Sequence, residues 1–195
     1  LGPVRLDWTG ELSSLGSQSL SQWLNELSAD ISFRELVHPS LSGLSGRILL
    51  GPTTGSLVVS GLTTQLNLPE VFPASPLRID KLGLEGEWSA SGLLASLAEQ
   101  ARLPSDFSFT LSSANLQLPQ ARLKLSGSYN FSGEGLGQAA LVGSLTDLLP
   151  EQVYQLLPTQ IGPQTRAWIE RGIREGSPVS GRFELRGALE DFPFR

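Results

Sequence analysis

The chain has 195 residues, a formal net charge of −5, 39% hydrophobic residues and 17% charged residues. This length allows one large domain or two small ones. Because the low charge content is made up by Ser, Gly, Thr, Gln and Asn, the composition is typical of turn-rich β structure. The small net charge and the regularly recurring leucines argue against disorder. Nucleic-acid binding and attraction to an anionic membrane surface have little electrostatic support, because no basic run occurs.

The absence of cysteine excludes disulfides, thiolate nucleophiles and cysteine-based metal sites. This composition is consistent with a bacterial envelope protein. The longest apolar runs fall far below the ~18 residues that a membrane-spanning helix needs. The chain begins Leu1-Gly2-Pro3 and contains no methionine. We therefore interpret it as a fragment of a longer protein and expect any anchor or targeting segment to lie outside it.

In the first half of the chain, the spacing of apolar residues changes between the period of two that strands show and the period that helices show. Residues 4–8 alternate and predict a first strand. In the range 17–28, leucines and a tryptophan recur at helical spacing, which predicts an amphipathic helix. From residue 31 the period returns to two and predicts four strands, at 31–36, 43–50, 56–68 and 77–88. Strict alternation in the third of these places Leu62, Leu66 and Leu68 on one face.

The second half continues the pattern with two helical interruptions. A stripe of Leu and Ala predicts a helix at 92–101, and a second helical region is expected at about 150–175. Alternation predicts the remaining strands at 107–111, 116–118, 123–131, 138–145 and 183–189. Connections of hairpin length and the lack of strand–helix–strand alternation favour an antiparallel sheet over a parallel one. The fold class is thus mainly β, with eight to ten strands, three short helical segments and no exact repeat.

No pattern of polar residues indicates catalysis. The single histidine, His38, precedes a proline and has no second His or Cys as a partner, which favours a turn residue over a metal ligand. Glu85 and Glu87 share a strand face, as solvated carboxylates often do. The Gly133-x-Gly135-x-Gly137 run lacks the helix that a phosphate-binding loop requires, so it predicts a hairpin turn. We expect no enzyme activity, no metal and no cofactor.

Aromatic side chains are concentrated on the apolar strand faces. Phe107, Phe109, Tyr129, Phe131 and Phe183 all alternate with polar residues. They would either fill the core of a β-sandwich or line an apolar groove for an acyl chain. Both arrangements bury the same residues, so the alternation leaves both open. Glycine also recurs beside the leucines, as in Gly83-Leu84-Glu85-Gly86, and we expect it to permit bends in the sheet.

A series of short motifs resembles the YhdP-type proteins of the AsmA-like superfamily, large bacterial envelope proteins related to TamB. The C-terminal motifs are Leu157-Pro158, Trp168-Ile169-Glu170-Arg171-Gly172-Ile173, Gly181, Arg186-Gly187-Ala188-Leu189 and Asp191-Phe192-Pro193-Phe194. Upstream, the similar segments are Asp7-Trp8-x-Gly10, Leu41-Ser42-Gly43-Leu44-Ser45-Gly46-Arg47, Leu68-Pro69-Glu70-Val71-Phe72 and Pro76-Leu77-x-Ile79-x-Lys81-Leu82. Their order and spacing cover most of the chain. The helix at 92–101 matches no part of the family pattern.

This resemblance implies an extended, strongly curved antiparallel sheet that forms an open trough, of which residues 1–195 would be a single section. The family is linked to phospholipid movement between the inner and outer membranes of Gram-negative bacteria. The expected location is the periplasm, with an inner-membrane anchor absent from this chain. Expected partners are phospholipid acyl chains and membrane partner proteins, without nucleic acid. The residues expected to line the groove are Leu84, Trp88, Phe107, Phe109, Leu111, Leu123, Leu125, Tyr129, Phe131, Phe183 and Leu185.

The alternative function is that of a structural or adaptor β domain of the cell envelope, with a filled core and no lipid cargo. An apolar strand face that is open would favour the trough, and one that is packed shut would favour the adaptor. The helical segments at 17–28 and 150–175 could cover the apolar face in either case.

Overall fold

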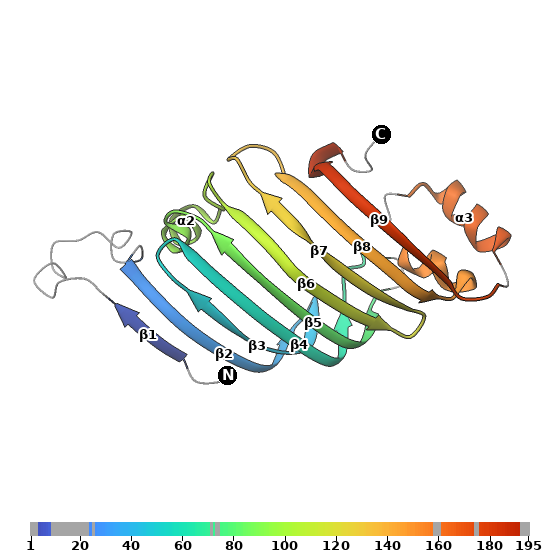
Figure 1. Ribbon diagram of the computed structural model, residues 1–195, viewed down its shortest axis with the longest axis horizontal. Helices are drawn as coiled ribbons and strands as arrows, with labels where there is room; N and C mark the ends of the chain where they lie inside the picture. Colours follow the sequence, from blue (N-terminus) through green and yellow to red (C-terminus); the bar gives the residue numbers. More distant parts are fainter. Residues whose placement is uncertain are drawn as a thin grey trace, which may run out of the picture.

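Among the residues that the structure describes, nine strands form one open antiparallel sheet whose spatial order is the order of the sequence (Figure 1). The structure is a computed structural model that describes residues 4–8, 24, 26–70, 72, 75–157, 161–173 and 176–191. Each strand pairs with its sequence neighbour, as short hairpin connections dictate. The strands are β1 (Val4–Trp8), β2 (Leu27–His38), β3 (Leu41–Leu50), β4 (Thr54–Leu66), β5 (Leu77–Ser89), β6 (Ser108–Leu118), β7 (Ala121–Asn130), β8 (Gln138–Leu148) and β9 (Val179–Ala188).

The predicted mainly β, antiparallel fold is confirmed, and two sequence-based boundaries are wrong. The two strands expected at 107–111 and 116–118 are one strand, β6, because a bulge at Ser112 and Ser113 interrupts its alternation. The helix expected at 17–28 extends too far, because Leu27 already begins β2. Residues 17–23 and 25 of that predicted helix lie outside the described residues.

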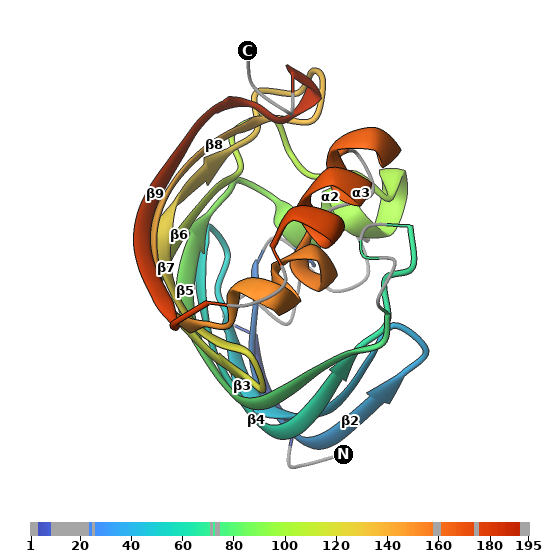
Figure 2. The ribbon, with the colours of Figure 1, turned by 90° about the vertical axis from the view of Figure 1, so that its right-hand side faces the viewer.

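The helical segments lie where the sequence predicts them. The helix α2 (Leu93–Gln100) follows β5, and Pro104 comes soon after its end. The predicted helical region at 150–175 consists of a 3₁₀ helix, η2 (Pro150–Leu156), and α3 (Pro163–Gly172). A short 3₁₀ turn, η3 (Leu189–Asp191), follows β9. Figure 2 shows that α2, η2 and α3 lie on the concave side of the curved sheet.

Bulges accompany the curvature of the sheet. The pairing register shifts within β2–β3, β3–β4, β5–β6, β6–β7 and β8–β9. A bulge adds one residue to a strand, bends it and increases the local twist. Several of the residues involved have a positive φ, including Glu35, Gly43 and Thr63. The strands therefore arch across the sheet, so that its two faces become a concave side and a convex side (Figure 2).

The bulge in β4 reverses the alternation predicted for that strand. Thr63 adopts a φ of 54°, so the residues on either side of it no longer follow a single period of two. Leu62 is 74% exposed, whereas Thr64 is fully buried and pairs with the buried Ile79 of β5. The Thr64 hydroxyl donates a hydrogen bond to the carbonyl oxygen of Gly43 at 3.4 Å. The prediction that Leu62 shares an apolar face with Leu66 is therefore wrong.

We infer from their deeper burial that the apolar rows of the sheet lie on its concave side. Side chains crowd together on the concave side of a curved sheet and spread apart on the convex side. Leu57, Val59 and Leu141 belong to the apolar rows and are half-buried. Val58 and Val142, their neighbours on the opposite face, are 53% and 48% exposed. We call the face of Val59 and Leu141 the inner face, and the face of Val58 and Val142 the outer face.

Within the part of the chain that the structure describes, no second layer is packed on the inner face. Each strand makes extensive contacts only with its neighbours in the sheet, and α3 makes them with η2. A β-sandwich would instead show contacts between non-neighbouring strands. The most deeply buried described residues are therefore few, and they include Thr64, Ile79 and Ala90.

Truncation of two leucine-sized residues would test the bulge in β4. Ile79→Ala removes a side chain that is only 2% exposed, so we expect the free energy of unfolding to fall by about 2–5 kcal/mol. Leu62→Ala removes an exposed side chain and should change it by less than ~0.5 kcal/mol. Urea unfolding measures both. Equal losses for the two variants would contradict the reversed alternation at Thr63.

Candidate apolar binding face

Four apolar rows run across β5 to β9 on the inner face. The pairing register defines each row, because residues directly opposite one another on neighbouring strands point to the same side. The rows are Leu82–Leu116–Leu123–Leu145–Gly181, Leu84–Ala114–Leu125–Gly143–Phe183, Gly86–Leu111–Gly127–Leu141–Leu185 and Trp88–Phe109–Tyr129–Ala139–Gly187. Every row contains leucine or an aromatic residue, and every row contains glycine.

The register brings most of the predicted groove residues together on these rows. They are Leu84, Trp88, Phe109, Leu111, Leu123, Leu125, Tyr129, Phe183 and Leu185. All of them are half-buried except Phe183, which is 42% exposed. Their role in lipid binding stays a prediction, whereas their shared face follows from the pairing.

Phe107 and Phe131 lie just beyond the strands, at the edge of the inner face. The backbone N–H of Phe131 donates to the carbonyl oxygen of Phe107 at 2.8 Å. The ring centroid of Phe107 is 6.2 Å from that of Tyr129, with a tilt of 57°. Phe131 also lines a depression of about 460 Å³ beside α2, together with Ala95. These two predicted residues therefore belong to an edge cluster next to α2.

The inner face extends further than the sequence-based set, over β2 to β4. The same register adds apolar residues that alternation alone did not assign to the site. They are Ala29, Ile31, Phe33, Leu44, Ile48, Leu50, Leu57 and Val59. Their strands show alternation in the sequence, but the register that aligns them with Leu84 and Trp88 emerges only from the paired strands. The apolar face is thus continuous from β2 to β9.

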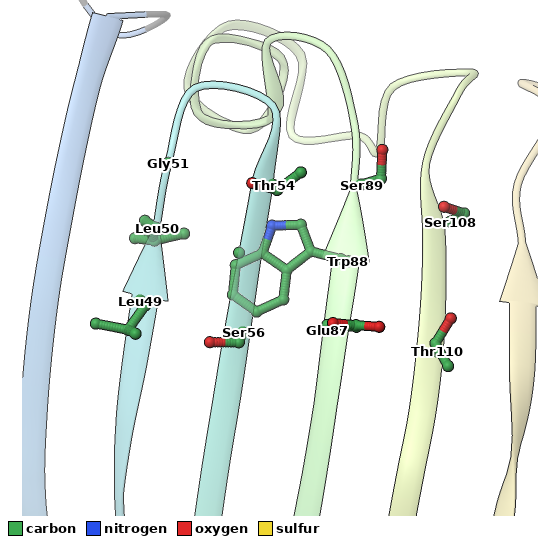
Figure 3. A pocket seen from close by; sticks show the side chains of 11 residues that line it. Leu49, Leu50, Gly51, Thr54, Ser56, Glu87, Trp88, Ser89, Ser108 and Thr110 are labelled. Atoms are coloured by element: carbon green, nitrogen blue, oxygen red, sulfur yellow. The ribbon is translucent and has the colours of Figure 1, made fainter.

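Four aromatic rings on the inner face lie over a glycine of the neighbouring strand. A Cβ atom added to Gly143 would lie 2.5 Å from Cζ of Phe183, and one added to Gly86 would lie 2.5 Å from Cζ of Phe109. At Gly46 the Cζ atom of Phe33 would be 2.8 Å away, and at Gly55 an added Cβ would collide with the indole of Trp88. Figure 3 shows this indole reaching from β5 across to β4. The rings therefore lie down along the sheet.

Tyr129 is fixed by the hairpin between β7 and β8. Its hydroxyl donates to the carbonyl oxygen of Leu136 at 3.0 Å. The backbone N–H of Leu136 in turn donates to Oε2 of Glu190 at 2.9 Å, which ties the hairpin to η3. The glycines of the Gly133–Gly137 run all have positive φ, as a tight connection requires. The prediction that this run is a hairpin turn is confirmed.

The outer face is mainly polar and carries a depression near one end of the sheet. This depression, of about 620 Å³, lies where β3 to β6 end near the turn at Gly51 (Figure 3). Ser56, Glu87 and Thr110 line it and are direct cross-strand partners. Leu49, Leu50 and Trp88 also line it, so the lining mixes apolar side chains with short hydroxyls and one exposed carboxylate.

Charged side chains on the outer face are exposed to water. Lys81, Lys124 and Arg182 occupy neighbouring outer rows of β5, β7 and β9. Arg122 forms an ion pair with Asp147 at 3.3 Å, and more than half of each side chain is exposed. Exposed pairs of this kind contribute at most ~1 kcal/mol. The charged groups of the outer face are therefore hydrated and contribute little to the stability of the sheet.

Residues that could take part in catalysis or metal binding are dispersed over the fold. His38 is exposed at the end of β2, and its Nδ1 accepts a hydrogen bond from the backbone N–H of Ser40 at 3.2 Å, so the turn interpretation is confirmed. Glu85 and Glu87 are exposed on the outer face, away from the apolar rows. Among the described residues, no three His, Asp or Glu side chains are close enough to hold a metal ion.

None of the helices in the described ranges combines the length and the apolar content that crossing a bilayer would require. No family model, no curated protein and no solved structure gives a significant match to this chain. The inner face is therefore interpreted from its own geometry.

The position of α2 at the edge of the inner face depends on a carboxylate that can be titrated. The backbone N–H of Ser91 donates to Oδ2 of Asp106 at 2.9 Å, which links the two ends of the segment that carries α2. Hydrogen bonding from the Ser91 side chain, and then from its backbone, lowers the pKa of Asp106 below the ordinary 3.8.

Because the folded-state pKa is the lower one, this contribution to stability is present above the ordinary carboxyl pKa. It is lost as the pH falls through the lowered value. An NMR titration of Asp106 should give a midpoint below 3.8, and Ser91→Ala should raise that midpoint. A wild-type midpoint at or above the ordinary value would show that the hydrogen bonds do not form in solution.

Proposed function

We propose that this chain is one section of a β-trough that carries phospholipid between the inner and outer membranes of a Gram-negative bacterium. The observation that supports this most strongly is the inner face. It is apolar from β2 to β9, and no described element packs over it as a second layer. Soluble proteins rarely leave a contiguous apolar patch of more than a few hundred Å² exposed, and larger ones mark sites for apolar partners.

The energetics favour an acyl chain as that partner. Each CH₂ group that leaves water for an apolar surface contributes ~0.8 kcal/mol. A lipid lying along the inner face would bury its chains against the leucine rows, while its headgroup stayed in water at the open side. Such binding requires no charged group on the inner face, and the four apolar rows that run across β5 to β9 contain no charged residue.

The similarity of successive rows suits movement along the sheet. Neighbouring strands are about 4.8 Å apart, and each presents leucine or an aromatic residue to the inner side. A chain that shifts by one strand exchanges one set of apolar contacts for a nearly equal set. The free energy therefore varies little along the path, and cargo can advance without leaving a deep binding well.

This function agrees with the one that the YhdP-type motifs imply. In our proposal the chain performs no catalytic step and needs no cofactor. The complete protein resides in the periplasm, is anchored in the inner membrane by a segment outside this chain and meets partner proteins in the membranes. The helices η2 and α3 lie at the open side of the sheet, where headgroups would pass (Figure 2).

Photocrosslinking at adjacent residues of opposite orientation would test this function. We expect a photoreactive amino acid at Val59 or Leu141 to capture phospholipid in cells, because both positions lie on the inner face. The same amino acid at Val58 or Val142 faces outward and should capture only background levels. Mass spectrometry of the crosslinked species identifies the lipid.

Each control differs from its test position by a single residue on the same strand, so expression and local stability are matched. Failure to capture lipid at either inner position would contradict the trough. It would instead favour a structural or adaptor domain whose apolar face is covered by protein. Capture of another protein at Val59 and Leu141 would identify that cover.

A further inference from the structure

The aromatic rings of the inner face do not project from it as strand side chains ordinarily do. Side chains stand roughly perpendicular to a sheet, so a Phe or Trp would normally rise above its leucine neighbours. Here each ring occupies the space that a neighbouring residue's Cβ would fill, which only glycine leaves empty. Phe33 pairs directly with Gly46, Trp88 with Gly55 and Phe183 with Gly143. Phe109 reaches diagonally to Gly86, a distance that aromatic side chains can span.

The rings are distributed along the path that cargo would follow. Phe33 lies on β2, Trp88 on β5, Phe109 on β6 and Phe183 on β9. A ligand that travels in strand order would meet each ring in turn. An erect ring would form a ridge across this path, whereas a ring lying over glycine leaves a level surface.

We propose that these glycine–aromatic pairs set the clearance above the inner face and thereby admit two-chain phospholipids. This inference rests on the proposed lipid-carrying function and deepens it by identifying the residues that determine cargo cross-section. The glycines act as positioning residues, since they act on the cargo through the rings. When an added methyl group lifts a ring, the ring projects into the concave side of the arched sheet (Figure 2) and takes up volume that the cargo would occupy, which excludes a two-chain lipid before it excludes a single-chain one.

Gly143 and Gly86 offer the clearest tests, because an added Cβ would mainly meet side chains there. At Gly143 the nearest atoms are Cζ and Cε1 of Phe183 and Cδ2 of Leu125, at 2.5–2.8 Å. At Gly46 and Gly55, by contrast, backbone carbonyl oxygens also lie within 2.6 Å, so substitution would disturb the sheet itself. Gly83 is the matched control, since it lies on the outer face and its Cβ would meet nothing within 4 Å.

The experiment measures how much fluorescent phosphatidylglycerol and how much single-chain lysophosphatidylglycerol the 195-residue chain takes up from vesicles and micelles. Gly143→Ala and Gly86→Ala should each lower loading of the two-chain lipid by about tenfold, the effect of overpacking by one methyl group. Loading of the single-chain lipid should change by less than about threefold. Gly83→Ala should match the wild-type chain for both lipids.

A rescue variant separates a lifted ring from general damage to the sheet. Phe183→Leu removes the ring, so the double variant Gly143→Ala/Phe183→Leu should recover two-chain loading. In wild-type protein, NMR should also place the Hα resonances of Gly143 upfield through the ring current of Phe183, and Phe183→Leu should remove that shift. This second readout reports the ring position without any lipid.

The outcomes distinguish failure of this inference from failure of the proposed lipid-carrying function on which it rests. If the wild-type chain takes up neither lipid, the proposed function and the inference both fail. If it takes up both, but Gly143→Ala behaves like Gly83→Ala, the inference alone is overturned. A loss that Phe183→Leu does not rescue, or a Gly143 Hα resonance at its ordinary position, would likewise overturn it.

Discussion

The constraint on which the rest of the structure depends is that each strand has one apolar face and the sheet has no partner sheet. The hydrophobic effect favours removing that face from water, but in the described part of the chain no second layer does so. Curvature of the sheet reduces the exposure of this face instead. It crowds the leucines of the inner face against one another, leaves the outer valines and charges in water, and keeps the inner face accessible to an apolar ligand.

The curvature is provided by local irregularities in the strands. The bulges near Glu35, Gly43 and Thr63 lie on three successive strands, and another at Ser112 and Ser113 follows on β6. Each places one or two extra residues in one strand and bends it. Glycines at other positions have a different effect, since they make room for aromatic rings on the inner face. Bulges and glycine–aromatic pairs together give a face that is concave and level.

The sequence predicted much of this architecture because the dominant signal, alternation of apolar and polar residues, is local. Alternation located most of the strands, and helical spacing located α2 and the 150–175 region. Bulges were missed because they depend on the backbone of paired strands: the two serines of β6 gave the impression of a break, and Thr63 reversed the orientation of Leu62. The beginning of β2 was missed because Leu27 fits both the alternation of a strand and the helical spacing of the helix predicted at 17–28.

The sequence predicted the apolar character of the candidate site but only part of its extent. The sequence identified Leu84, Trp88 and Phe109 as members of an apolar face. It could not align them with the rows of β2 to β4, because register is a property of pairs of strands. The recurrent glycines beside leucines were visible, and we expected them to allow bends. Gly43 does so, but Gly86 instead accommodates the ring of Phe109, and a contact of that kind is not encoded by spacing along one strand.

The central claim is that the inner face is apolar, open to solvent and able to take acyl chains, and thiol labelling tests it most directly. Because the chain has no cysteine, Leu141→Cys and Val142→Cys each introduce a unique thiol, one on each face of β8. We predict that a small neutral maleimide labels both folded variants, more slowly at the half-buried position 141 than at position 142, and that phosphatidylglycerol vesicles slow labelling further only at position 141. No labelling at position 141 in the folded protein without lipid, or no effect of lipid there, would contradict the account.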